Sequence, residues 1–150
     1  MNDFNIEQDV QLVLQEELVT LRESIAANIR DKGLNTSGAT IASMQVQVEG
    51  MTGTLYGRPY FAALETGTRP WAKQYAKPPR FFVQIIKDWA NMKRLDINAW
   101  LTARKIMREG SKTFREGGRK DIFTPEIDTT LDNIGTRLAG LFVVAATQRL

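Results

Sequence analysis

The chain has 150 residues, of which 43% are hydrophobic and 25% are charged, a composition typical of a folded globular domain. It contains no cysteine and no histidine, so the sequence offers no disulfide, no thiolate zinc site and no imidazole for acid–base catalysis. This excludes most familiar enzyme mechanisms and leaves serine–lysine, paired-carboxylate and magnesium chemistry open. We predict a single domain over residues 1–150 that is not an enzyme and needs no cofactor.

The charges are unevenly distributed along the chain, although the net charge is only +3. Residues 1–68 carry four basic and nine acidic groups, residues 69–120 carry fourteen basic and four acidic groups, and residues 121–150 carry two basic and four acidic groups. The middle third is therefore strongly basic. Its partner is nucleic acid, an acidic protein surface or the acidic part of an identical copy, and charge alone does not distinguish these.

The sequence predicts neither a membrane span nor a secretory signal. The longest unbroken apolar run, residues 138–146, is shorter than the roughly 20 residues that cross a bilayer. The first residues are acidic, whereas a secretory signal begins with basic residues and continues into an apolar stretch. We therefore expect a protein made in the cytoplasm that does not contact a membrane.

The N-terminal third predicts a long helix followed by a β-hairpin. Apolar residues recur every three or four positions between Asn5 and about Lys32, a stretch without proline or glycine that is typical of one amphipathic helix. At 1.5 Å per residue this helix is about 40 Å long, so we expect part of it to face a partner. Residues 44–49 then alternate between apolar and polar side chains, and a turn at residues 50–53 leads to a returning strand at residues 54–56.

A short helix and a proline-rich loop follow. The helix is predicted over residues 60–65 and has about two turns. Gly67 is expected to end it in a left-handed conformation. Glu65 and Thr68, on either side, are expected to fix this structural turn, and Glu65 is also placed to pair with a basic neighbour. Residues 68–80 contain three prolines, which predicts a long loop.

The C-terminal half predicts three further helices. One begins after Pro79, and a second runs from near Asp96 to Gly110. The last helix begins with Thr124 as its N-cap and Pro125 at its first position.

A second basic loop is predicted at residues 112–120, which contain two glycines. Trp89 and Trp100 are spaced with isoleucine and leucine on their helices, so we expect both to lie in the core. The predicted fold class is α+β, with a small antiparallel sheet packed against a long N-terminal helix and further C-terminal helices.

The two basic loops are the candidate contact surfaces. The first loop, residues 68–80, interleaves Trp71 and Tyr75 with lysine and arginine, a mixture that suits protein interfaces and can also stack on bases and pair with phosphates. The aromatic residues of the first loop have the structural alternative of anchoring that loop. The candidate partner-binding residues are Arg69, Trp71, Lys73, Tyr75, Lys77, Arg80, Lys112, Arg115, Arg119 and Lys120.

Catalytic and metal chemistry find little support. The glycines near Lys112 and Lys120 lack the spacing or the hydroxyl of a phosphate-binding loop. Asp128 and Asp132 are four residues apart and could hold magnesium through waters, but acidic residues near a helix start more often complement the helix dipole. Ser111 is adjacent to Lys112 in a loop, which is not an arranged nucleophile and base. We predict no catalytic and no metal-binding residues.

Three segments occur in a distinctive order along the chain. They are Thr36–Ser43, then, after the hairpin, Tyr60–Pro70, and finally Pro78–Phe82. This series resembles the small tail-completion proteins of tailed bacteriophages, which are also called minor tail, neck or head–tail joining proteins. The resemblance covers about residues 5–90, and residues 91–150 form a helical extension without a counterpart.

The family pattern is a long first helix, a Thr-Gly-x-Leu-x-x-Ser turn, a hairpin, a Tyr-Ala-x-x-Val-Glu-x-Gly-Thr segment and a Pro-x-x-Phe motif. This chain departs from it in four places. Ser37 precedes Gly38 where the family has threonine, Phe61 is inserted after Tyr60, and Leu64 replaces the valine. The loop before Pro78 also contains more aromatic residues than is usual in the family.

Membership would imply a virion structural protein without enzymatic activity, which forms a ring at the head–tail joint, as a hexamer in preference to a dodecamer. Its partners would be its own copies and other neck, portal or tail proteins, and it would be assembled in the host cytoplasm. The acidic first part and basic middle suit head-to-tail packing of copies, and the loops could reach DNA in the channel. The alternative is a small basic nucleic-acid-binding protein that uses the two loops.

Overall fold

The computed structural model describes residues 5–148, which form mostly helices and one small sheet. The predicted α+β class is confirmed, since two antiparallel strands pack against the long N-terminal helix. In chain order the elements are α1 (Ile6–Asp31), α2 (Ala39–Ala42), β1 (Gln45–Glu49), β2 (Thr52–Tyr56), α3 (Ala63–Thr66), α4 (Arg80–Met92), α5 (Ala99–Glu109), α6 (Lys112–Arg115) and α7 (Thr124–Gln148).

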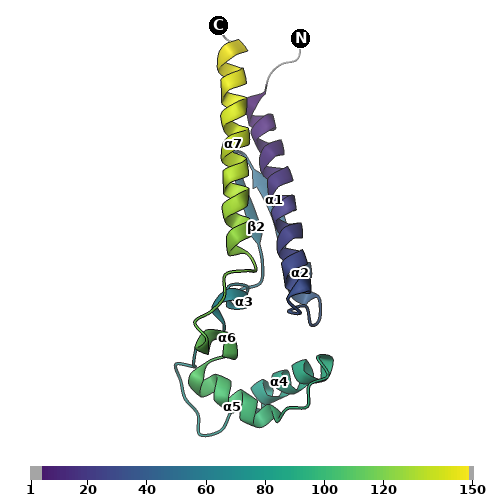
Figure 1. Cartoon of the computed structure of the whole chain (residues 1–150), viewed down its shortest axis with the longest axis vertical. Helices are drawn as coiled ribbons and strands as arrows, with labels where there is room; N and C mark the ends of the chain where they lie inside the picture. Colours follow the sequence, from purple (N-terminus) through teal and green to yellow (C-terminus); the bar gives the residue numbers. More distant parts are fainter. Residues whose placement is uncertain (1–4, 149–150) are drawn as a thin grey trace.

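The molecule is elongated, with its two longest helices side by side (Figure 1). α1 and α7 run antiparallel, and the β1–β2 hairpin lies against α1. The α4–α5 pair lies at the far end of the molecule, beyond α3 and α6. We name residues 5–56 and 121–148 the helical body, and residues 80–109 the helical hairpin.

One continuous apolar face explains why α1 forms. Asn5 begins the helix by accepting a hydrogen bond from the amide of Gln8 at 3.2 Å, and acidic side chains in the first turn complement the helix dipole. The predicted helix is confirmed, because Asn5 and Lys32 are its two caps. Its buried side chains are Val10, Val13, Leu14, Leu18, Leu21, Ile25, Ala26 and Ile29.

The core of the helical body is built from segments far apart in the sequence. It combines the apolar face of α1 with Met44, which precedes β1, and with Ile122, which precedes α7. α7 then packs along α1. Residues 91–150, which have no counterpart in the resembled family, therefore supply part of the core.

Polar side chains reinforce the contact between α1 and α7. The amide of Asn28 donates to the carbonyl of Ile122 at 2.9 Å and to the carboxylate of Glu126 at 3.0 Å. Further along the pair, the guanidinium of Arg137 donates to the carboxylate of Glu16 at 2.6 Å. The two helices are thus tied at two levels along their length.

The β-hairpin has a shorter turn than predicted. Thr52 and Gly53 belong to β2, so the turn of Gly50–Met51 replaces the expected one over residues 50–53. A side chain at Gly53 would come within 2.6 Å of Leu18 Cδ1. The glycine therefore lets the strand approach α1 closely.

Helix α3 is shorter than the two turns predicted over residues 60–65. The backbone makes a chain of i to i−3 hydrogen bonds that starts at the carbonyl of Arg58, and α-helical bonding is limited to four residues. The segment is therefore a tightened turn that leads into one turn of helix.

Two other helices differ in extent from their predictions. α5 begins at Ala99 rather than near Asp96, because the side chain of Asn98 caps it by accepting from the amide of Leu101 at 3.0 Å. α6 occupies part of the predicted loop over residues 112–120, where the hydroxyl of its N-cap accepts from the backbone.

Candidate interaction surfaces

A buried carboxylate joins α3 to the start of α7. Glu65 is 4% exposed, and its Oε1 accepts hydrogen bonds from the amides of Ile122, Phe123 and Thr124 at 3.1, 2.8 and 2.9 Å. The Thr124 hydroxyl donates to its other oxygen. A negative charge here satisfies amides that a helix N-terminus leaves unpaired, and it complements the helix dipole.

This geometry corrects two predictions. Among the described residues Glu65 makes no ion pair with a basic side chain, because its partners are amides and a hydroxyl. Thr124 does not act as an N-cap acceptor, because its hydroxyl donates to Glu65. Burial by itself raises the pKa of Glu65, but the hydrogen bonds from Thr124, Phe123 and Ile122 outweigh burial and hold the pKa below its ordinary value.

The turn after α3 brings the two predicted basic loops together. Gly67 has φ +73° and ψ 178°, a combination that essentially only glycine adopts, although the ψ is extended rather than left-handed helical as predicted. The Thr68 amide donates to the hydroxyl of Ser111 at 2.9 Å, and the Thr68 carbonyl accepts from the Ser111 amide at 2.8 Å. These residues are 43 apart in the chain. We name residues 65–68 and 111–124 the junction.

Trp71 anchors the first loop to the helical hairpin. Its amide donates to the carbonyl of Met107 at 2.9 Å, and its ring lies 4.8 Å from that of Phe82 and 6.3 Å from that of Phe81, measured between centroids. Tyr75 meets the indole edge-on at 6.3 Å and is 39% exposed. The loop is therefore held in place by its first aromatic residue.

The basic candidates differ in their surroundings. Arg119 donates through Nε and Nη2 to the carboxylate of Asp121 at 2.6 and 2.8 Å, and Lys32 of the α1 C-cap lies 3.3 Å from the same carboxylate. The hydrogen bond from Arg119 and the second cation hold the pKa of Asp121 well below its usual range. Arg119 is thus engaged within the chain. The exposed candidates are Arg69, Lys73, Lys77, Arg80, Lys112, Arg115 and Lys120.

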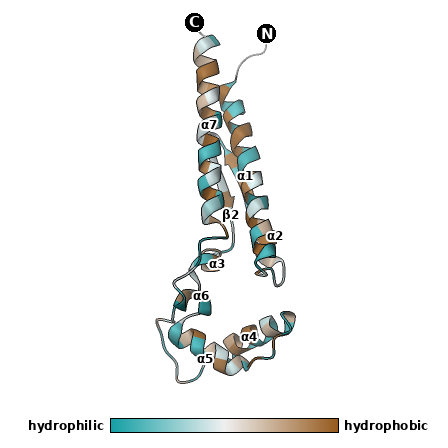
Figure 2. Cartoon of the chain, viewed as in Figure 1, coloured by the Kyte–Doolittle hydropathy of each residue, from teal (hydrophilic) through white to brown (hydrophobic). Residues whose placement is uncertain are grey.

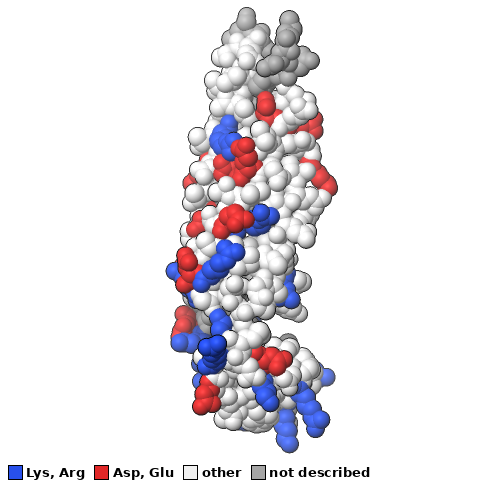
Figure 3. All heavy atoms as spheres, turned by 90° about the vertical axis from the view of Figure 1, so that its right-hand side faces the viewer, with Lys and Arg blue, Asp and Glu red and all other residues white. Residues whose placement is uncertain are grey.

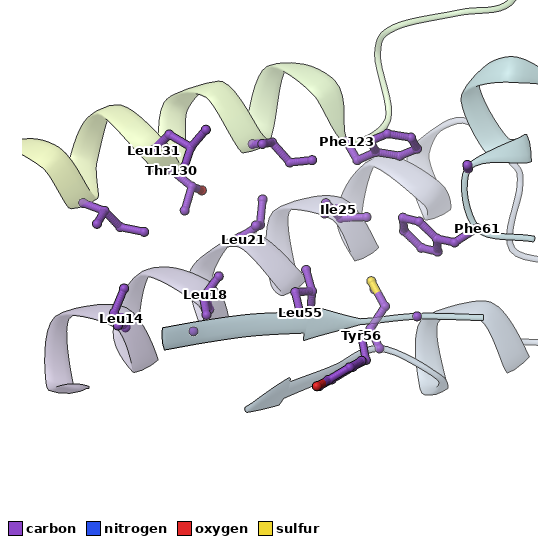
Figure 4. A pocket seen from close by; sticks show the side chains of 16 residues that line it. Leu14, Leu18, Leu21, Ile25, Leu55, Tyr56, Phe61, Phe123, Thr130 and Leu131 are labelled. Atoms are coloured by element: carbon purple, nitrogen blue, oxygen red, sulfur yellow. The ribbon is translucent and has the colours of Figure 1, made fainter. Parts of the chain in front are cut away.

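An apolar groove of about 540 Å³ lies between α1, β2 and α7 (Figure 4). Figure 4 shows side chains from these elements converging on the space, with Phe61 and Phe123 near one end. Leu131 is 62% exposed and Ile127 is 37% exposed, so the α7 side of the groove is open to solvent. The α1 and α7 residues that line it are Leu14, Leu18, Leu21, Ile25, Ile127, Thr130, Leu131 and Ile134.

The helical hairpin has a second apolar surface, which the rest of the described chain leaves exposed. In Figure 2, brown hydrophobic segments alternate with teal and white segments along both of its helices. The prediction that Trp89 and Trp100 lie in the core is wrong, since each is 38% exposed. When two helices pack only against each other, each buries only the side that faces its partner. The buried side chains of the helical hairpin are Ile86, Ala90, Ala103 and Met107. The exposed ones include Phe81, Ile85, Trp89, Met92, Trp100 and Leu101.

The two apolar surfaces lie on parts of opposite charge. The helical body carries four basic and eleven acidic side chains, and the helical hairpin carries seven basic and three acidic ones. In Figure 3, lysine and arginine side chains project from the hairpin end, and most of the acidic side chains in view lie over the body. The charge segregation seen in the sequence is therefore also a separation in space.

The chain exposes more surface than a compact monomer of its mass. Its accessible surface is 10405 Å², whereas a folded 16.9 kDa monomer exposes about 7,700 Å². Giving residues 1–4 and 149–150 the area of a fully extended chain, about 1,100 Å², still leaves an excess of about 1,600 Å². A standard protein–protein complex buries about this total area.

No three acidic side chains gather as a metal-binding group within residues 5–148, where Asp128 and Asp132 are exposed on α7. None of the helices in this part of the chain has the length and apolar character to span a membrane. No known protein family, curated protein or solved structure matches this chain.

Proposed function

We propose that this protein is a virion structural protein that assembles into a closed ring at the head–tail joint of a tailed bacteriophage. Support for the location comes from the resemblance of residues 5–90 to tail-completion proteins. Support for assembly comes from the exposed apolar surfaces of the body and the hairpin. A structural role of this kind needs no catalytic side chain, cofactor or metal.

The excess of about 1,600 Å² of exposed surface is the observation that carries the proposal. In a ring of head-to-tail contacts every subunit offers two different faces, and a standard interface buries about 800 Å² per partner. The two faces of one subunit would together bury about 1,600 Å², which equals the excess of exposed surface. The opposite charges of the body and the hairpin also fit a contact between unlike faces.

We expect cryo-electron microscopy of the phage particle to show this chain as a ring, a hexamer by preference, between the portal and the tail. A cyclic arrangement follows because a heterologous contact that closes on itself leaves no face unpaired. A single copy per particle, a position on the capsid exterior or absence from purified particles would each refute the proposal.

Nucleic-acid binding is the second candidate, because the junction brings the two basic loops together. We expect the isolated protein to bind DNA weakly and to lose it as salt approaches about 150 mM, since phosphate contacts are screened and release counterions. Fluorescence anisotropy with a labelled duplex measures this. Binding that survives this salt and weakens in an Arg69→Ala, Lys73→Ala, Lys77→Ala variant, but not in an Arg30→Ala, Arg58→Ala control, would favour the second candidate.

A further inference from the structure

We propose that the helical hairpin of one copy docks into the apolar groove between α7 and β2 of the next copy. This inference rests on the proposed ring and specifies which two faces meet. The occupant of the groove is a second copy of this chain, and the contact is heterologous.

The apolar stripe of α4 has the form of a helix that inserts into a groove. Phe81, Ile85, Trp89 and Met92 follow at spacings of four, four and three, and they are 63%, 56%, 38% and 55% exposed. Ile86, on a neighbouring face of α4 about 100° away from Ile85, is 8% exposed. α4 therefore has one side committed to α5 and another free to bind, the pattern of helix-in-groove recognition.

The dimensions of the two faces agree. The stripe from Phe81 to Met92 spans eleven helical steps, about 16 Å. On the floor of the groove, the α1 residues from Leu14 to Ile25 also span eleven steps and the same length. The α1 floor is already buried, so on the groove side docking removes mainly the apolar surface of Ile127 and Leu131 on α7 from water, and on the hairpin side it removes that of the α4 stripe.

Charge complementarity selects a second copy as the occupant. Asp128 and Asp132 follow the groove residues Ile127 and Leu131 directly on α7 and are exposed beside them. The hairpin as a whole carries seven basic and three acidic side chains, but on α4 the exposed Asp88 borders the stripe and the exposed Lys87 lies on the opposite side of the helix. The opposite net charges of the hairpin and the body, both of which belong to this chain, therefore favour a second copy as the occupant.

The position of the hairpin favours docking between copies. The junction, the Trp71 anchor and a hydrogen bond from Lys93 to the carbonyl of Gly33 hold it at the end of the molecule beyond α3 (Figure 1). The groove lies between α1, β2 and α7 of the body. The hairpin is therefore presented outward to a neighbour. Repetition of this contact from copy to copy produces a ring when the rotation closes.

Cross-linking between single-cysteine variants tests the contact, because the chain has no cysteine of its own. Ile85→Cys and Leu131→Cys are prepared separately, one of them labelled with nitrogen-15, mixed, and treated with a short bis-maleimide. Leu12→Cys is the matched control, since Leu12 is 57% exposed and does not line the groove, compared with 62% for Leu131. Circular dichroism checks that each variant is folded.

We expect mass spectrometry to find the 85–131 product about tenfold or more above the 85–12 product. Adding excess unlabelled wild-type protein should lower the yield of the 85–131 product, because it occupies the same contact. Adding the same excess of an Ile85→Asp variant should leave that yield unchanged. A predominance of 85–85 or 131–131 products would indicate a symmetric contact and overturn the inference, as would equal yields with the control. A ring in particles without the 85–131 product refutes only this contact, whereas absence of any ring refutes the proposed function as well.

Discussion

Replacing Gly67 with valine should destabilise the protein by about 3 kcal/mol or more, because backbone strain and a steric clash act together. The residue has φ +73° and ψ 178°, a region that costs a β-branched residue about 1–3 kcal/mol. A Cβ would also lie 2.3 Å from the backbone nitrogen of Phe114 and 2.7 Å from the Ser111 hydroxyl oxygen. The backbone of α6 cannot move away without opening the junction.

Thermal and denaturant unfolding measure this effect. A loss of about 3 kcal/mol corresponds to a fall in Tm of about 6–12 °C for a chain of this size. Gly33→Val is the matched control, since Gly33 has φ +69° but open space around its Cβ position. The control substitution should lower the free energy of unfolding by about 1–2 kcal/mol, because only the strain of a positive φ acts there. An equal loss of stability in Gly67→Val and Gly33→Val would contradict the expected steric clash between a side chain at position 67 and the backbone of α6.

Replacing Glu65 with glutamine should cost about 3 kcal/mol, because one buried acceptor serves three amides and a hydroxyl. A glutamine oxygen could still accept from the three amides, but the negative charge that strengthens these bonds is lost and an NH2 donor replaces the oxygen that accepts from the Thr124 hydroxyl. Asp128→Asn, at an exposed acidic position in the second turn of α7, the helix whose N-terminus Glu65 contacts, should cost only a few tenths of a kcal/mol, about what one exposed charge gains from the helix dipole. Urea unfolding at neutral pH compares the two variants.

The effect of Glu65 should also depend on pH. Its folded pKa lies below the ordinary value of 4.5, so its contribution to the free energy of unfolding is complete above about pH 4.5 and is lost as the pH falls through the folded pKa. The stability difference between wild type and Glu65→Gln should therefore shrink in acid. A difference that stays constant or grows below pH 4.5 would contradict the proposed hydrogen bonding of the carboxylate.

The long first helix was predictable, because its determinants are local. A single apolar stripe between Asn5 and Lys32, without glycine or proline, specifies both the helix and its buried face. The sequence predicts too long a turn for the hairpin, because glycine is a common turn residue and the predicted turn therefore includes Gly53. Its actual role is to let β2 approach Leu18, and that requirement arises only when strand and helix are packed together.

The determinants of the junction could not be found by local reasoning. Glu65 and the amides it serves are separated by 57 to 59 residues, so no spacing rule connects them. Thr124 followed by Pro125 has the sequence of an N-cap, but a nearby carboxylate is a stronger acceptor than the hydroxyl and changes its role from acceptor to donor.

The exposed face of the hairpin did have a signal in the sequence. α4 is apolar at Ile86 and Ala90, which are buried, and also at Phe81 and Ile85, which are exposed. A helix in a two-helix unit buries only one side, so apolar residues on a second side indicate a further partner. The groove had no comparable signal, because it arises from the separation between α7 and β2 in space.

The pairing of α1 with α7 has a consequence for the order in which the chain folds. Their contacts join residues as far apart as Asn28 and Ile122 or Glu16 and Arg137, separations of 94 and 121 residues. Such non-local contacts slow folding, because the intervening segment must be closed before they form. On the ribosome, about 5–20 s of synthesis separate the two helices. During that interval the nascent α1 has only the β-hairpin to cover its apolar face, so the body closes after α7 has emerged from the exit tunnel.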